Sequence, residues 1–147
     1  LSSINYKDYL KELFDSNIKS FFTIENKVEF DLDVRVEFVN IDTAITLGLL
    51  INEILTNSLK YAFKQRSKED LVYIKIINLE SLDFILKIGD NGVGIPKNFN
   101  YKTSNSLGIN LVHKLVKQLS GNLEQDYSKK GTHYIIYFKE IEVQSIQ

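Results

Sequence analysis

The segment GDNGVGIP, from Gly89 to Pro96, places one carboxylate in front of a loop that is nearly free of side chains. It holds three of the seven glycines of the chain and its only proline. The residues before it, LDFILKI (82–88), have a strand pattern, so we expect a strand that ends at Asp90. Side chains at a strand end can point into a pocket, and glycines at 92 and 94 allow positive φ and a close approach of the backbone to a flat ligand.

Two common glycine-loop motifs do not fit this segment. Its G-x-G spacing is not followed by a helix with a further glycine, so it is not a dinucleotide-binding fingerprint, and no P-loop Gly-Lys-Ser/Thr occurs. A simple hairpin turn is an alternative, because Asn91-Gly92 is a strong turn dipeptide. In favour of binding, the Asp90 carboxylate is an acceptor that suits an exocyclic amine such as that of adenine.

The composition is that of one ordinary globular domain. The chain has 147 residues, 44% of them hydrophobic and 25% charged, and its formal net charge of −1 gives no global attraction to nucleic acid or a membrane surface. It has no cysteine, which excludes disulfides and fits a reducing compartment, so we expect a cytoplasmic domain. The longest apolar stretch, Ile45–Ile51, is too short to span a bilayer, and the N-terminus lacks a signal-peptide shape. Because the chain has no methionine, we expect a fragment of a longer protein.

Hydrophobic periodicity predicts helices and strands of a single α+β domain. The expected elements are a helix over about 5–18, one strand or two short ones over Lys27–Val39, a long helix from an N-cap at Asp42 to about Phe63, two strands joined by a turn at Asn78–Ser81, a helix from Leu107 to Ser120–Gly121, and the strands NLEQDY (122–127) and THYIIYF (132–138). The polar segment 97–106 lacks periodicity and is typical of a functional lid. The fold class is therefore α+β, a two-layer sandwich with a mixed, largely antiparallel sheet covered on one face by helices.

The long helix carries polar residues on a surface that is otherwise largely apolar. Its polar positions form one narrow stripe of helical spacing, made of Glu53, Asn57, Lys60 and Lys64. A carboxylate and an amide one turn apart offer oxygen ligands to a hard cation such as Mg²⁺, and the next lysine could meet a phosphate. The alternative is a solvated stripe, in which each pairwise contact contributes about 0.2–0.5 kcal/mol.

Two further segments, SLGINLV (106–112) and GTHY (131–134), follow the glycine loop. Gly108 lies in the first turn of an expected helix, and helix N-termini bind phosphate readily. Thr132 brings a hydroxyl to the start of the last strand. Each segment has an ordinary alternative, a helix start capped by a serine and a hairpin glycine followed by a β-branched residue.

In this order and spacing, the segments resemble the catalytic ATP-binding domain of sensor histidine kinases, a Bergerat-type ATP-binding fold of the superfamily that also contains gyrase-type, chaperone and mismatch-repair ATPases. NEILTNSLKYAF (52–63) looks like the family's N-box, DNGVGIP (90–96) like its G1 box and SLGINLV (106–112) like its G2 box. The resemblance covers roughly residues 40–138 and is closest to the branch with a compact lid. No clear F-box separates G1 from G2, and the usual Gly-Leu-Gly-Leu of G2 reads Ser-Leu-Gly-Ile here, which leaves the movement of the lid open.

The resemblance implies roles for individual residues. Asp90 would accept the adenine amine, and Asn57 would hold an Mg²⁺ ion that bridges the ATP phosphates. Glu53 matches the acidic position that positions or activates water in hydrolysing relatives. The implied catalytic residues are Glu53, Asn57 and Lys60. Among the implied nucleotide-binding residues, Lys60 would contact a phosphate, Tyr61 would lie beside the adenine, Gly92 and Gly94 would shape the purine pocket, and Gly108 would lie at the lid hinge. The other implied nucleotide-binding residues are Asn57, Asp90, Ile95, Asn105, Leu107 and Thr132, with Lys97 and Lys102 as further lid cations.

By the same resemblance, the domain would donate the γ-phosphoryl group of ATP to a histidine on a separate helical domain, expected upstream of Leu1, with a response regulator as the downstream partner. Neither His113 nor His133 lies in a helical hairpin, so neither looks like the acceptor. We expect a homodimeric full-length protein, a monomeric or weakly dimeric fragment, and no nucleic-acid partner. The expected organisation is a helix over 1–20 that is a connector or a remnant of the dimerisation and phosphoacceptor domain, the ATP-binding domain over 21–140 and a polar tail over 141–147.

Three alternative functions have the same fold. An anti-sigma-factor-type serine kinase would phosphorylate a partner protein. A conformational ATPase would use Glu53 to activate water and would dimerise with nucleotide, although only a polar tail follows Phe138. A degenerate nucleotide-binding module would carry no chemistry, and the intact Asn57, Asp90 and Gly108 argue against it.

Overall fold

The computed structural model describes residues 3–21, 28–36, 38–94 and 107–142. Its elements are β1 (Ser3–Asn5), α1 (Tyr6–Phe21), β2 (Glu29–Val34), β3 (Phe38–Asn40), α2 (Ile41–Asn57), the π-helix η2 (Ser58–Ala62), β4 (Leu71–Glu80), β5 (Asp83–Asp90), α3 (Leu107–Gln118), β6 (Asn122–Gln125) and β7 (His133–Lys139). The expected α+β class is confirmed, and the alternating segment 27–39 forms two strands rather than one.

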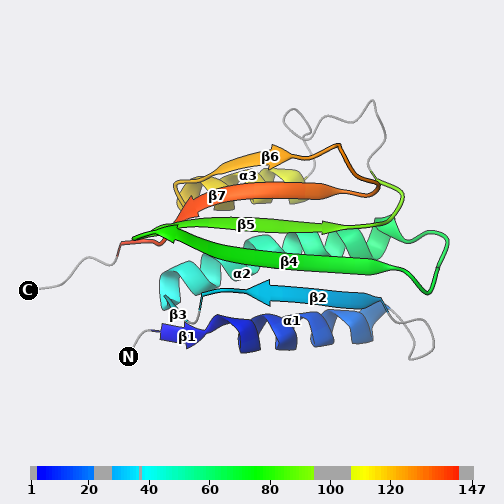
Figure 1. Ribbon diagram of the computed structural model, residues 1–147, viewed down its shortest axis with the longest axis horizontal. Helices are drawn as coiled ribbons and strands as arrows, with labels where there is room; N and C mark the ends of the chain where they lie inside the picture. The colour runs from blue at the N-terminus through cyan, green and yellow to red at the C-terminus, as the bar shows by residue number, and fades with distance from the viewer. Residues whose placement is uncertain (1–2, 22–27, 37, 95–106, 143–147) are drawn as a thin grey trace, which may run out of the picture.

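A mixed five-stranded sheet has the order β2-β4-β5-β7-β6 (Figure 1). β2 runs parallel to β4, and the other neighbours in this sheet are antiparallel, as expected from the sequence. A small antiparallel pair of β1 and β3 lies apart from it. Strand β1 was not predicted, because three residues are too few to establish an alternating pattern.

The helices and the sheet form two layers around one apolar core. Figure 1 shows α2 and α3 behind the sheet and α1 beside β2. Alternate residues of the central strands face the helices and are at most 1% exposed, among them Val72, Ile74, Ile76, Leu86, Ile88 and Ile136. This period of two follows from the pleat of a β-strand and gives the sheet one apolar face and one polar face.

Helix α1, predicted as a connector, packs onto the same core. Its residues Tyr6 and Leu10 are each 1% exposed, and the Tyr6 hydroxyl donates a hydrogen bond of 3.2 Å to the carbonyl of Ala44 in α2. The helix is therefore part of the packed unit, although a domain boundary near residue 20 stays a prediction.

Two predicted element ends were wrong. The N-cap of α2 is Asn40, not Asp42, because Asn40 has an extended backbone and its side chain accepts a 2.9 Å hydrogen bond from the Thr43 N–H. The β4–β5 turn lies at Ser81 and Leu82 rather than at 78–81, because the ladder continues past a register shift near Asn78 and Ser81 has a φ of 51°. Helix α3 begins at Leu107 as predicted.

Candidate functional site

Asp90 ends β5 with a carboxylate that is buried but well supplied with donors. The residue is 1% exposed, and its Oδ1 accepts backbone N–H hydrogen bonds from Gly92 at 2.9 Å and Thr132 at 3.3 Å. Its Oδ2 accepts a 2.7 Å hydrogen bond from the hydroxyl of Ser58. These donors offset the cost of burying a charge. A carboxylate has about four acceptor sites, so three donors leave room for one more, such as an exocyclic amine.

Ser58 is a site residue that sequence reasoning missed. A signal was available, because at about 100° per residue Ser58 falls between Leu47 and Ile51, in the middle of the apolar face of the long helix. A hydroxyl there must find a partner inside the protein, since an unpaired buried hydroxyl is costly. The partner is Asp90, 32 residues further along the chain.

Beyond Asn57 the long helix changes to the π-helix η2, and this turn adjoins the glycine loop. The Ser58 N–H donates to the carbonyls of both Ile54 and Leu55, and the Ala62 carbonyl accepts a 2.9 Å hydrogen bond from the Val93 N–H. π-Helical turns are rare and occur frequently at functional sites. The sequence predicted one continuous helix here, because periodicity does not distinguish a π-turn from an α-turn.

Position 92 requires glycine for a reason other than the predicted positive φ. Its φ is not positive, and a Cβ at this position would collide with the backbone and side chain of Ala62. The glycine therefore allows the loop to pack against η2. Its N–H, held on the Asp90 carboxylate, is its direct contribution to the site.

Gly94 and Gly131 both have the positive φ that favours glycine, at 79° and 103°. A Cβ on Gly94 would lie 3.3 Å from the Gly131 carbonyl oxygen, and one on Gly131 would collide with the Asp90 carbonyl. The Thr132 carbonyl accepts a 2.9 Å hydrogen bond from the Asp90 N–H. The prediction that Gly94 adopts positive φ is confirmed, and Thr132 adjoins Asp90 as predicted, through its backbone.

At the other part of the site, the start of α3 lies against the polar stripe of α2. A Cβ on Gly108 would lie 2.6 Å from Glu53 Oε1 and 3.9 Å from Asn57 Nδ2. Glu53 and Asn57 are both partly buried. The structure therefore brings three predicted residues together, where the N–H groups of the first turn of α3 lack intrahelical partners.

The predicted cation and aromatic side chains of η2 lie on the surface. Lys60 is exposed, and Tyr61 is 62% exposed, so its ring is available for contact. The predicted four-residue stripe is wrong at Lys64, which lies past the end of η2 at Ala62.

Several predicted lid residues lie outside the described residues, namely Ile95, Lys97, Lys102 and Asn105. The structure describes the backbone of Leu107 as the first residue of α3, but not its side chain.

Of the two histidines, His133 is buried at the start of β7, with a contact at each ring nitrogen. It is 5% exposed, its Nδ1 is 2.7 Å from the Tyr73 hydroxyl oxygen, and its Nε2 is 2.8 Å from the carbonyl oxygen of Lys130. Burial, with the nearby carboxylates of Asp126 and Asp90, raises the pKa of Tyr73 to about 12. His113 lies on α3 and is partly buried.

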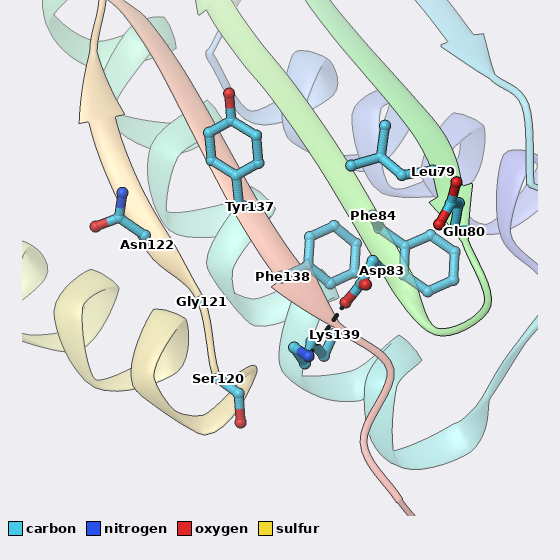
Figure 2. A pocket seen from close by; sticks show the side chains of 10 residues that line it. All are labelled: Leu79, Glu80, Asp83, Phe84, Ser120, Gly121, Asn122, Tyr137, Phe138 and Lys139. Carbon is cyan, nitrogen blue, oxygen red and sulfur yellow. Dashed lines mark ion pairs between the residues drawn. The ribbon is translucent and has the colours of Figure 1, made fainter.

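A pocket of about 560 Å³ opens at the opposite end of the sheet from Asp90 (Figure 2). It is lined by Leu79, Glu80, Asp83, Phe84, Ser120, Gly121, Asn122, Tyr137, Phe138 and Lys139. None of the residues predicted to bind nucleotide is among them, and its one marked ion pair joins Lys139 Nζ to Asp83 Oδ1 at 3.4 Å.

Within ranges 3–21, 28–36, 38–94 and 107–142, no three His, Asp or Glu side chains gather into a group that could hold a metal ion. Across the same part of the chain, no helix combines the length and apolar character needed to cross a membrane.

Residues 42–142 match the family of histidine kinase-, DNA gyrase B- and HSP90-like ATPases. Blue-light-activated histidine kinase 2 of Erythrobacter litoralis is 28% identical over 111 residues, which cover 74% of this chain and 32% of that protein. Sensor histidine kinase PdtaS of Mycobacterium tuberculosis is 32% identical over 98 residues, which cover 65% of this chain and 19% of that protein. The chain therefore spans about a third or less of the length of these relatives.

Solved structures share the fold. The histidine kinase domain from the blue-light activated histidine kinase of Erythrobacter litoralis has a TM-score of 0.80 at 24% identity and is matched over 93% of this chain and 62% of that one. The mycobacterial sensor histidine kinase MprB has a TM-score of 0.69 at 20% identity, over 93% of this chain and 95% of that one. The family match covers more than half of the chain, so the chain belongs to the histidine kinase-, DNA gyrase B- and HSP90-like ATPases, and the solved structures share its fold.

Proposed function

We propose that this domain binds Mg²⁺·ATP and presents the γ-phosphoryl group to a histidine on another part of a longer protein. The observation that carries the proposal is the grouping of two complementary subsites around α2 and η2. Asp90, with Ser58, offers an acceptor for an amine, and Gly108 lies against Glu53 and Asn57 where helix α3 begins. The first subsite suits adenine and the second suits phosphates.

Asp90 would select adenine by accepting a hydrogen bond from the exocyclic amine on Oδ2. The three protein donors fix the carboxylate before nucleotide arrives, so little order has to be gained on binding. The exposed ring of Tyr61 could cover the base, and the exposed Lys60 could reach a phosphate.

Asn57 is the residue that would hold Mg²⁺, through its amide oxygen. A neutral hard oxygen donor fits this cation, which usually takes few protein ligands and completes its shell with water and phosphate oxygens. The bound ion would neutralise phosphate charge during transfer.

The reaction we propose is an in-line phosphoryl transfer. A nitrogen of the acceptor imidazole forms a bond to the γ-phosphorus while the bond to the β–γ bridging oxygen breaks, and ADP leaves. Because the imidazole is itself the nucleophile, the domain contributes position and charge rather than a general base. The same proposal includes an acceptor histidine on another segment of the longer protein and a response regulator as the downstream partner. It also includes a homodimeric full-length protein and a cytoplasmic location of this domain.

The Mg²⁺ and phosphate parts are tested by titrating ATP calorimetrically, with and without Mg²⁺. The parent should bind ATP in about the micromolar range, more tightly with Mg²⁺, and Asn57→Ala should lose the dependence on Mg²⁺. Asn122→Ala, on the exposed edge strand β6, is the matched control and should keep it. An equal dependence on Mg²⁺ in Asn57→Ala and the parent would contradict the role of Asn57.

The transfer step is tested by adding the histidine-bearing helical part of a related kinase together with γ-labelled ATP. We expect acid-labile label on the added part and none on this chain alone. Acid-stable label on serine would favour the serine kinase alternative instead.

The conformational ATPase is a second candidate, because Glu53 is partly buried and adjoins the first turn of α3, where it could orient a water at the phosphates. It predicts steady ATP hydrolysis by the chain alone, lost in Glu53→Gln. The histidine kinase proposal predicts little hydrolysis without an acceptor.

A further inference from the structure

His133 and Tyr73 form a hydrogen-bonded pair on the sheet face that points away from the helices. The Lys130 carbonyl can only accept, so in the neutral ring Nε2 carries the proton and Nδ1 accepts from the Tyr73 hydroxyl. The two rings are also stacked, with centroids 5.6 Å apart. One tautomer therefore satisfies both contacts of a ring that is 5% exposed.

The hydrogen bond from His133 to Lys130 spans three residues and encloses Gly131 and Thr132. Both enclosed residues contact Asp90. The Thr132 N–H donates to Asp90 Oδ1, and Gly131 is so close that a Cβ on it would collide with the Asp90 carbonyl. The ring thus holds the short segment that supplies one of the three donors to the carboxylate.

Gly89 provides the space for this pair. In the sheet register, Gly89 lies between Tyr73 of β4 and His133 of β7. A Cβ on Gly89 would lie 2.7 Å from His133 Nδ1 and 2.9 Å from the Tyr73 hydroxyl oxygen. The next residue along β5 is Asp90, whose side chain points to the helix side. The pair and the carboxylate therefore lie on opposite faces of the sheet at the same level.

We propose that His133, held by Tyr73, is a positioning residue that fixes the backbone of Gly131 and Thr132 behind Asp90 and thereby sets the preference of the site for a 6-amino purine. This inference rests on the proposed function, in which Asp90 accepts the adenine amine. Neither side chain touches the nucleotide. Their effect passes through the Thr132 N–H and the orientation of the Asp90 carboxylate.

The test compares two ligands, ATP and purine riboside 5′-triphosphate, which lacks the exocyclic amine. Each is titrated calorimetrically into the parent, Tyr73→Phe, His133→Ala and His133→Gln. We expect Tyr73→Phe and His133→Ala to raise the Kd for ATP by about 2- to 10-fold, the range of one hydrogen bond, and to leave the Kd for the purine analogue unchanged. His133→Gln should lose less affinity for ATP than His133→Ala, because the glutamine amide can still donate to the Lys130 carbonyl.

Tyr137→Phe is the matched control, since Tyr137 lies on the same strand β7, at the end of the sheet far from Asp90. It should leave both affinities unchanged. Where His133→Ala does not fold, Tyr73→Phe and His133→Gln decide the matter, and melting temperatures identify the folded variants.

Equal weakening of both nucleotides, or no weakening of either, would overturn the positioning role. The variant Asp90→Asn separates this failure from a failure of the proposed function. If Asp90→Asn removes the preference for ATP over the analogue while Tyr73→Phe does not, only the positioning role is wrong. If Asp90→Asn also keeps the preference, Asp90 does not read the amine and both proposals fall.

Discussion

Strand β5 has an aspartate at each end, and the two are held in opposite ways. Asp83, at the start, has a side chain that is 49% exposed and forms a 3.4 Å ion pair with Lys139, which is itself 63% exposed. Asp90, at the end, is 1% exposed and accepts three hydrogen bonds from the protein. The Asp83 end has the pocket, yet its charges are solvated and paired.

Burial with donors, rather than a hollow, therefore marks the proposed nucleotide site. An exposed ion pair contributes about 0–1 kcal/mol to stability and needs few supporting hydrogen bonds from the surrounding protein. A buried carboxylate is costly, so donors converge on it from η2, the glycine loop and the residue before β7.

Gly92→Ala should clearly lower the stability of the domain. The added Cβ would collide with the backbone of Ala62, which cannot move without distorting η2, and overpacking of this kind costs about 1–3 kcal/mol. Urea denaturation measures the loss. Gly108→Ala is the control and should cost less than half as much, because the nearest contact of its Cβ would be the flexible end of Glu53. Equal stability of Gly92→Ala and the parent would contradict the packing of the loop on η2.

Ser58→Ala should weaken ATP binding by about 5- to 10-fold, or roughly 1 kcal/mol, because Asp90 loses its hydroxyl donor on Oδ2. Calorimetric Kd values measure the effect. Ser120→Ala, at the pocket end of the sheet, should change nothing. An unchanged Kd in Ser58→Ala would mean that this hydroxyl does not help to prepare the carboxylate.

Alkaline titration tests the surroundings of Tyr73. Its pKa is raised from the ordinary 10.0 to about 12, so between these values the unfolded chain has lost the proton while the folded chain keeps it. The unfolded state then binds fewer protons, and the free energy of unfolding falls as the pH rises from about 10 to 12. Tyr73→Phe should flatten this fall in denaturation midpoints, whereas Tyr127→Phe, at a tyrosine that is 71% exposed, should not. The same slope in Tyr73→Phe and the parent would refute the raised pKa.

Asp83→Asn should have the smallest effect. Its ion pair with Lys139 is exposed to solvent, so the free energy of unfolding should change by less than about 0.5 kcal/mol and ATP binding not at all. Denaturation and calorimetry of one preparation provide both values. A large loss of affinity would mean that the pocket end takes part in binding after all.

Much of this fold was predictable, because alternating strands and amphipathic helices repeat a signal over many residues. The alternation in β4 and the apolar face of α3 are of this kind. So was the approach of Gly108 to Glu53 and Asn57, which depended on the joint order of short segments.

The rest depended on single contacts between distant residues. Ser58 meets Asp90 across 32 positions, and Tyr73 meets His133 across 60, distances over which periodicity carries no information. The π-turn at η2 and the cap at Asn40 are local, but each is decided by a few hydrogen bonds that compete closely with the predicted alternatives.

The most direct test of the central claim is the Kd for ATP of Asp90→Asn measured beside that of Asp83→Asn. An asparagine at 90 is nearly isosteric, but its amide replaces one carboxylate oxygen with a donor group. We predict that Asp90→Asn weakens ATP binding by about 100-fold or more, as expected when a buried charged acceptor is lost, and that Asp83→Asn binds like the parent. Equal affinities for the two variants would contradict the claim that the buried end of β5 is the nucleotide site.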